Sequence, residues 1–330
     1  MVRVSFVVSL AVAALVAGPV VAAPPASADT HPSGCGVGVR RVSRATRGTP
    51  VLLVHGFAGG PSDFRRRIDG NASMLGAIRD LPGVVAYTFD YSQHSLDWVT
   101  APAIGEALGR AIVCLADHHG RPITVVAHSM GGLATRQAQG QVVGGKPVAA
   151  SLDRVITVGT PFRGTQLLGF AGGSGGDVLR EVVGAALRAC DTNVTRRPGR
   201  SFCDLLGASE TAAVQGMIPG SHQLDALPRW SPHVRIAPIA AEIEVGVGGP
   251  LGFASQFAVG DFAVSVASAT ADSSPGIPRF VATCHASLFG LLDALDGSPC
   301  SHANELANRR IIHRVRQLVR ATATRESASS

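Results

Sequence analysis

The stretch Ile123-Thr-Val-Val-Ala-His-Ser-Met-Gly-Gly-Leu133 joins an apolar run to a serine that stands between small residues. Its first half, Ile123–Ala127, is β-branched and uninterrupted, which is typical of a strand buried on both faces. A helical pattern follows directly. Ala127 and Gly131 stand two residues before and two after Ser129, where a sharp strand-to-helix turn leaves room only for small side chains. The stretch therefore predicts a turn that presents the Ser129 hydroxyl as a nucleophile.

Outside this stretch, short β-branched runs alternate with longer helical patterns from about residue 50 onward. Such alternation predicts an α/β fold, with a mostly parallel sheet of about six strands flanked by helices. The runs are so short and apolar that we expect every one of these strands in the interior of the sheet. The predicted strands are Pro50–Val54, Val84–Phe89, Ile123–Ala127, Val155–Gly159, Val234–Ile239 and Phe280–Thr283. The predicted helices are Ala103–His118, Met130–Gln141 and Leu306–Val319.

The first predicted strand runs into His55-Gly56-Phe57 and a glycine-containing loop. An oxyanion that develops beside Ser129 needs backbone N–H donors aimed at it, and each donor is worth roughly 10²–10³ in rate. We assign the N–H groups of Phe57 and Met130 to this oxyanion hole. A phosphate-binding loop is the alternative, but this segment has neither a Walker Lys-Ser/Thr pair nor a G-x-G-x-x-G spacing.

The chain begins with the apolar run Val4–Ala23, which follows Arg3 and precedes Pro24-Pro25. Small residues at Ala23 and at Ala26-Ser-Ala28 predict a cleavable signal peptide over residues 1–28, and a membrane anchor is the alternative because the run is long enough to span a bilayer. We therefore expect a secreted, extracellular protein in which residues 29–330 form one α/β domain.

Six cysteines in an exported chain predict three disulfides. Two pairs would each close a short loop rich in Gly, Pro or Ser, and the third follows by elimination. A buried helix thiol is the alternative for Cys114. The expected pairs are Cys190–Cys203, Cys284–Cys300 and Cys35–Cys114.

The net charge of +6 comes almost entirely from arginines that are scattered along the sequence. No basic run is interleaved with aromatic residues, so we expect no nucleic-acid partner. The charge predicts some attraction to anionic surfaces.

The alternation of strands and helices breaks at about residues 166–232. This span holds a glycine-rich loop at 171–176 and an amphipathic stretch at 178–187. We interpret it as a cap or lid inserted above the sheet, and a packed subdomain without a gating role is the alternative.

Three segments together resemble the bacterial lipase and esterase branch of the α/β-hydrolases, over about residues 50 to 320: His55-Gly-Phe57, Ala127-His-Ser-Met-Gly131 and Val158-Gly-Thr-Pro-Phe-Arg-Gly-Thr165. The resemblance implies an α/β-hydrolase fold and a triad in the chain order Ser, acid, His. It also implies hydrolysis of acyl or lipid esters through an acyl-enzyme, without a cofactor. Some members bind a structural calcium ion, for which no residue of this chain can be assigned, so we predict no metal.

The acid of the triad is expected in the segment Gly260-Asp-Phe-Ala-Val-Ser-Val-Ala-Ser-Ala269, which resembles the acid loop of that branch. Asp261 is the predicted acid. The segment departs from the family pattern at Phe262, where Gly is often found. Glu242 and Glu244, placed directly after the preceding predicted strand, are the fallback.

Two histidines remain for the base, because the site of such a sheet lies at the carboxyl edge of its strands. His302 stands before the last predicted helix at the spacing of the family's catalytic histidine. His285 follows the last predicted strand, at a compact spacing from Asp261 that is also typical of the family. We predict His302 and keep His285 as the alternative.

The predicted function is thus a serine hydrolase that cleaves carboxylic esters with Ser129, Asp261 and His302. The enzymatic alternative is acyl transfer to a cell-envelope acceptor by the same triad. The non-enzymatic alternative is a binding protein with a hydrolase-like fold. We expect a monomer that makes at most transient contact with a lipid surface.

Overall fold

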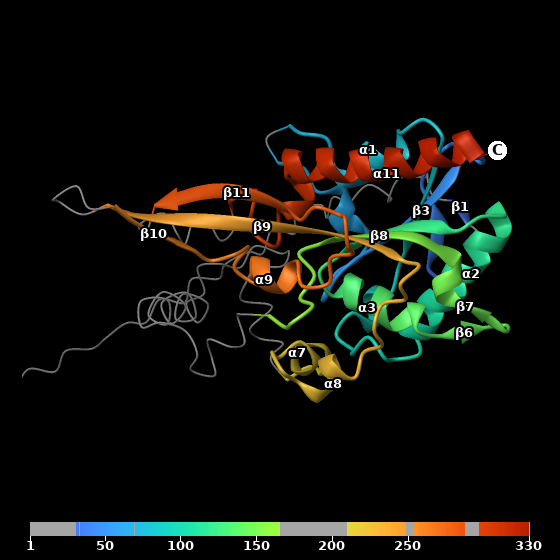
Figure 1. Ribbon diagram of the computed structural model, residues 1–330, viewed down its shortest axis with the longest axis horizontal. Coiled ribbons are helices and arrows are strands. Elements are labelled where there is room, and N and C mark those ends of the chain that lie inside the picture. Colours follow the sequence, from blue (N-terminus) through green and yellow to red (C-terminus); the bar gives the residue numbers. More distant parts are fainter. Residues whose placement is uncertain are drawn as a thin grey trace, which may run out of the picture.

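The structure is a computed structural model that describes residues 31–32, 34–68, 70–165, 210–248, 254–287 and 297–329. These residues form a central sheet with helices on both faces (Figure 1). The sheet strands are β1 (His31–Pro32), β2 (Val39–Arg41), β3 (Thr49–Val54), β4 (Val84–Phe89), β5 (Ile123–His128), β8 (Leu152–Val158), β9 (Arg235–Gly248), β10 (Ala254–Ala258) and β11 (Phe280–Ser287). They lie in the order β1-β2-β4-β3-β5-β8-β9-β10, and β11 pairs with β9. A separate hairpin joins β6 (Val142–Val143) to β7 (Lys146–Pro147).

The helices fall between and around these strands. The α-helices are α1 (Met74–Arg79), α2 (Gly105–His119), α3 (Met130–Gln139), α7 (Ala212–Gly216), α8 (His222–Asp225), α9 (Val266–Ala269) and α11 (Arg309–Ser329). Short 3-10 turns are η1 (Pro61–Arg65), η2 (Ser92–His94), η3 (Val148–Ser151) and η6 (Glu305–Ala307).

Each face of the sheet has its own apolar core, because successive side chains of a strand point to opposite faces. In β3, Leu52 and Val54 pack with residues of α2 and α3. Val51 and Leu53 pack on the other face with residues of α1 and α11. All four are fully buried, which explains why the strand is a continuous apolar run.

The predicted α/β architecture is confirmed. The six predicted strands correspond to β3, β4, β5, β8, β9 and β11, which pair in parallel with one another. The three predicted helices correspond to α2, α3 and α11. The sequence analysis missed three strands of the central sheet, β1, β2 and β10, which pair antiparallel at its margins, and it also missed the hairpin strands β6 and β7.

Two expectations about the last strands were wrong. The strand predicted to end at Ile239 continues to Gly248, because beyond it Ile243 and Val245 stay buried while Glu242 and Glu244 emerge on the other face. β11 is not an interior strand: among the described residues it pairs with β9 alone, and its outer half is partly exposed.

Several predictions fall wholly or partly on residues outside the described part. These are the signal peptide, residues 166–209 of the predicted cap, and the Cys190–Cys203 pair; from residue 210 the chain forms α7 and α8. The other two disulfides are confirmed, with Cα–Cα distances of 5.5 Å for Cys35–Cys114 and 5.9 Å for Cys284–Cys300. The alternative of a free thiol at Cys114 is therefore wrong. No helix in the described residues has the length and apolar character needed to cross a bilayer.

Candidate active site

Ser129 stands at the turn between β5 and α3 in a strained conformation, with φ 53° and ψ −132°. Strain of this kind costs about 1–3 kcal/mol and is held by surrounding contacts. The Ser129 N–H donates to the Val158 carbonyl at 2.9 Å, and the Thr160 hydroxyl donates to the Ser129 carbonyl at 3.0 Å. A Cβ atom at Gly131 would lie 2.6 Å from the Val54 carbonyl oxygen, which shows why this position needs glycine.

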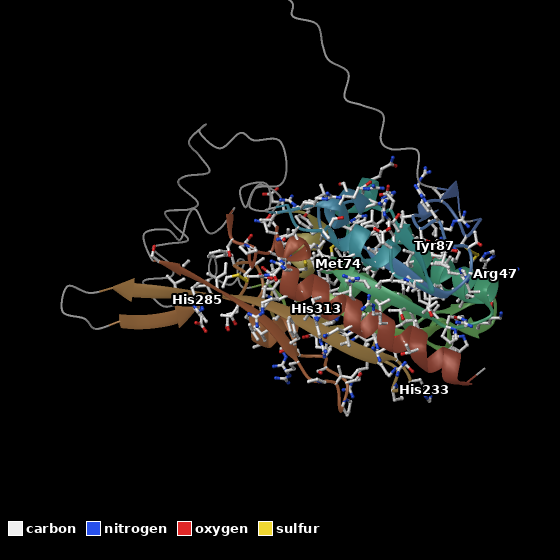
Figure 2. The ribbon with its side chains drawn as sticks, turned by 90° about the horizontal axis from the view of Figure 1, so that it is seen from above. Arg47, Met74, Tyr87, His233, His285 and His313 are labelled. Carbon is white, nitrogen blue, oxygen red and sulfur yellow. A yellow bond between two sulfur atoms is a disulfide. The ribbon has the colours of Figure 1, made fainter. Side chains whose placement is uncertain are left out.

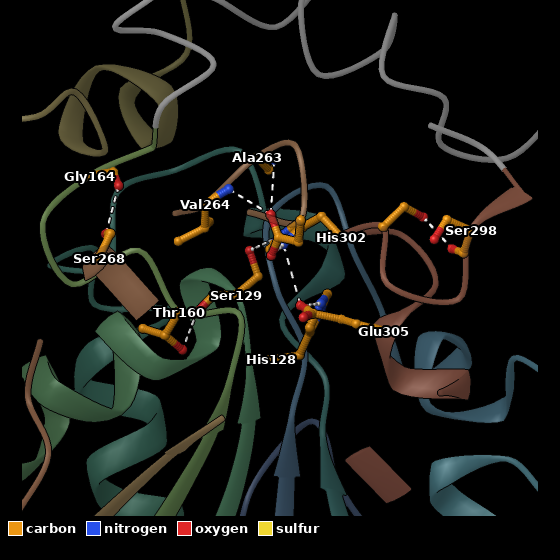
Figure 3. A network of polar contacts seen from close by, with 12 residues as sticks. His128, Ser129, Thr160, Gly164, Ala263, Val264, Ser268, Ser298, His302 and Glu305 are labelled. Carbon is orange, nitrogen blue, oxygen red and sulfur yellow. Dashed lines mark hydrogen bonds and ion pairs between the residues drawn. The ribbon is translucent and has the colours of Figure 1, made fainter. Parts of the chain in front are cut away.

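His302 lies beside Ser129 (Figure 3), and its two ring nitrogens face Ser129 and Asp261. The Ser129 hydroxyl donates to Nε2 of His302 at 2.7 Å, and Nδ1–H of His302 donates to Oδ2 of Asp261 at 2.8 Å. Both distances fall in the range of about 2.6–3.2 Å that base and nucleophile require. The structure thus brings together the three side chains that the sequence analysis proposed as a triad.

The loop around Asp261 points its carboxyl at His302. Oδ1 of Asp261 accepts the backbone N–H groups of Ala263 at 2.9 Å and Val264 at 2.6 Å, and the residue is 1% exposed. The loop turns sharply at Phe262, which has φ 77°, a conformation that favours glycine. Phe262 therefore adopts the same left-handed backbone conformation that a glycine would adopt at this position.

Opposing influences act on the pKa of His302. Burial lowers it, but the Asp261 carboxylate, its hydrogen bond and Glu305 outweigh burial and raise the pKa to about 9. The neighbouring His128 is different, because burial and the charge of His302 lower its pKa to about 3. His128 is therefore neutral at physiological pH.

The alternative residues lie elsewhere. His285 sits inside β11 opposite Glu244 of β9, and its side chain is 75% exposed. Nδ1 of His285 is 3.2 Å from Oε2 of Glu244, so the two form a surface pair. The fallback carboxylates Glu242 and Glu244 belong to β9 and form no hydrogen bond or ion pair with His302 among the described residues.

Glu305 is a component that the sequence analysis missed. It is fully buried, and its Oε1 lies 3.1 Å from Nε2 of His128 and 3.3 Å from Nδ1 of His302. Burial and the nearby Asp261 carboxylate raise the pKa of Glu305 well above its usual value. Gly159, at φ 57°, makes room for it, because a Cβ atom there would overlap the Glu305 carboxyl. The available signal was an acidic residue three positions after His302, next to the apolar pair Leu306-Ala307.

The loop after β3 lies directly against Ser129. A Cβ atom at Gly56 would be 2.7 Å from Cβ of Ser129. The N–H groups of Phe57 and of Met130, the first residue of α3, donate to no acceptor in the described part of the chain. Both N–H groups therefore remain available beside the serine.

His55 holds this loop in place. The Tyr91 N–H donates to Nε2 of His55 at 3.1 Å, so the ring proton is on Nδ1 and is directed to the Gly56 carbonyl at 3.0 Å. The Tyr91 hydroxyl donates to the His55 carbonyl at 2.6 Å, and the two rings stack at 3.9 Å. His55 is thus a neutral, fully buried support for the loop.

One group in the described residues has the composition of a metal site. Donor atoms of His128, His302 and Glu305 lie within 4.8 Å of one another. Both ring nitrogens of His302 already bind Ser129 and Asp261, so the arrangement suits proton transfer and we assign no metal to it.

A parallel α/β sheet that carries a serine at a strained strand-to-helix turn, within reach of a histidine and an aspartate, defines the α/β-hydrolase class. In agreement with this, a family model described as "Alpha/beta hydrolase family" matches residues 51–304. The chain belongs to the alpha/beta hydrolase family, and the resemblance noted in the sequence is confirmed at this level.

Two solved structures of one bacterial enzyme have a similar fold. Lipase BlEst2 from Bacillus licheniformis in its mature form is 17% identical, with 83% of this chain and 93% of that chain covered and a TM-score of 0.51. Its propeptide form is 19% identical, with 83% and 51% covered and a TM-score of 0.50. No curated protein matches the sequence. At these identities the likeness is one of fold.

Proposed function

We propose that the chain is a carboxylic ester hydrolase of the lipase and esterase type, with Ser129, His302 and Asp261 as its triad. The observation that carries the proposal is the 2.7 Å hydrogen bond from the Ser129 hydroxyl to a histidine whose other nitrogen binds a buried carboxylate. This is the pairing of nucleophile, base and orienting group that acyl transfer to a serine requires. The lipase fold of the structural relatives agrees with it.

In the first half of the reaction, Oγ of Ser129 attacks the ester carbonyl carbon as Nε2 of His302 takes its proton. The carbonyl oxygen becomes an oxyanion, to which the N–H groups of Phe57 and Met130 donate. The tetrahedral intermediate then collapses, the bond to the alcohol breaks, and the imidazolium protonates the leaving oxygen. Water repeats the sequence on the acyl-enzyme and releases the acid. Asp261 fixes the tautomer of His302 and stabilises its positive charge.

We also propose that the protein works outside the cell. The two disulfides of the described residues are typical of oxidising compartments, and they agree with the predicted signal peptide. N-terminal sequencing of the protein from the culture medium tests this, and a mature chain that retains residues 1–28 would contradict it.

The variant Ser129→Ala tests the mechanism. It should reduce the hydrolysis of p-nitrophenyl esters by about 10⁶-fold in kcat. A fluorophosphonate probe should label the wild-type protein and leave Ser129→Ala unlabelled. A variant that keeps most of its esterase rate would exclude Ser129 as the nucleophile. Wild-type rates on acetate, octanoate and palmitate esters then give the preferred acyl length.

A further inference from the structure

Helix α11 concentrates positive charge on the sides that it does not bury. Ile311, Val315 and Val319 pack into the core of the sheet. Between residues 309 and 320 the helix also carries five arginines and no acidic residue, although the arginines of the whole chain look scattered in sequence. The arginines are Arg309, Arg310, Arg314, Arg316 and Arg320.

Four of these arginines line an open hollow of about 850 Å³, which we call the α11 hollow. Its other walls include Phe280 at the start of β11 and the segment 70–72 before α1. Asn71 and Gln317 add amide groups, and no carboxylate is among the described residues that line it. Figure 2 shows the helix from above, with His313, another lining residue, near its first turns.

The arginines of the hollow have no acidic partner within the described residues. Some arginines elsewhere in the described residues do have such a partner, as in Arg235 with Asp153 and Arg136 with Asp272. In the hollow, the Nε–H groups of Arg314 and Arg316 are shielded from solvent and have no acceptor in the part of the chain that the structure describes. The guanidinium of Arg314 lies 5.9 Å from the centre of the Phe280 ring. Among the described residues, positive charge is thus gathered here without a compensating carboxylate.

We propose that the α11 hollow docks the protein onto the phosphate head groups of an anionic phospholipid bilayer. Guanidinium groups form paired hydrogen bonds to phosphate oxygens, which suits this lining. Arg309 and Arg316 are about 10 Å apart along the helix axis, further than one phosphate reaches, so several head groups are engaged together. The apolar face of α11 is already packed against the sheet, so the contact is electrostatic and does not insert the helix.

This docking site would serve a hydrolase whose substrate lies in a lipid surface. The arginines of the hollow lie in the N-terminal half of α11. This half of the helix begins at Arg309, shortly after the triad residue His302 in the sequence. The docking does not depend on catalysis, and it can be measured with the inactive Ser129→Ala protein.

Co-sedimentation with vesicles tests the proposal. We compare vesicles of pure phosphatidylcholine with vesicles that also contain phosphatidylglycerol, at low and high salt. The first variant is Arg310→Gln, Arg314→Gln and Arg316→Gln together. The matched control removes the same charge from exposed arginines of the N-terminal segment: Arg40→Gln, Arg44→Gln and Arg47→Gln.

The wild-type protein should bind the anionic vesicles at low salt and dissociate from them at high salt. A basic residue near such a surface contributes roughly fivefold in binding, so the first variant should bind on the order of 100-fold more weakly. The affinity of the control variant for anionic vesicles should fall far less. Both variants should hydrolyse a soluble ester at the wild-type rate. Equal loss in the two variants, or equal binding of the two kinds of vesicle, would overturn the proposal. Displacement by inorganic pyrophosphate at concentrations too low to act as salt would also overturn it, in favour of a site for soluble phosphates.

Discussion

The change Glu305→Gln replaces a buried carboxyl beside His302 by an amide of nearly the same shape. Oε1 of Glu305 is 3.3 Å from Nδ1 of His302, close enough for the two groups to titrate as a pair. Burial and the Asp261 carboxylate raise the pKa of Glu305, and a protonated His302 lowers it. A positive charge on His302 therefore favours the ionised carboxyl, and the ionised carboxyl in turn stabilises the imidazolium and raises its pKa.

The size of the effect follows from this distance. Only neutral His302 can accept the Ser129 proton, so kcat/KM should rise with pH and reach half its maximum near the His302 pKa of about 9. A full charge 3.3 Å away would interact by about 5 kcal/mol at an effective dielectric constant of about 20. Because the raised pKa of Glu305 reduces the negative charge that the carboxyl carries, we expect Glu305→Gln to lower the midpoint by on the order of one pKa unit. At pH 7, below both midpoints, kcat/KM should then rise on the order of tenfold.

The assay is the pH profile of kcat/KM on a soluble p-nitrophenyl ester, from neutral to alkaline pH. Glu244→Gln is the matched control, because Glu244 also faces a histidine but lies away from the triad. Its midpoint should equal that of the wild type. A midpoint in Glu305→Gln that stays in place or moves to higher pH would refute the reasoning, provided that the thermal unfolding curve shows a folded protein.

Three further predictions concern the rest of the molecule. His302→Ala should reduce kcat by about 10⁴–10⁶-fold, whereas His285→Ala should stay within about a factor of two; the reverse order in an ester assay would move the base to His285. Asp261→Asn should reduce kcat by up to about 10⁴-fold with little change in KM, because the amide favours the wrong tautomer of the histidine, and a loss confined to KM would argue against this role. Replacing Cys35 and Cys114 by serine should lower the free energy of unfolding by about 4 kcal/mol, since the bridge spans 79 residues. Urea unfolding measures this loss, and an unchanged midpoint would mean that the bridge does not constrain the unfolded chain.

The turn at Ser129 could be predicted because its causes are local. A tight bend between a buried strand and a helix needs small residues at fixed positions, and Ala127 and Gly131 occupy them. The structure adds the reason for Gly131, since the Val54 carbonyl of the next strand leaves no space for a Cβ atom. The interior strands were predicted for the same reason, because burial on both faces gives a continuous apolar run.

The choice between His302 and His285 could not be made locally, because it depends on where the last strand ends. The apolar run stops at Thr283, but pairing with β9 carries β11 on to Ser287 and places His285 in the strand beside Glu244. The local sequence pattern also cannot predict a strand that forms only because a neighbouring strand offers backbone hydrogen bonds. β1 and β2 are short and polar, and they are strands only because β4 offers an open edge.

Two carboxyl groups lie beside His302, and their roles differ because their hydrogen-bond partners differ, although both are acidic residues. Asp261 accepts two backbone N–H groups as well as the histidine, so its negative charge is stabilised by fixed donors. Glu305 receives no backbone donor in the described residues, and its Oε2 has no partner at all there. Its Oε1 has only the ring nitrogens of His128 and His302 beside it, so burial raises the pKa of Glu305 and a positive charge on His302 lowers it. One carboxyl thus orients the base throughout the cycle, while the other adjusts how strongly the base holds its proton.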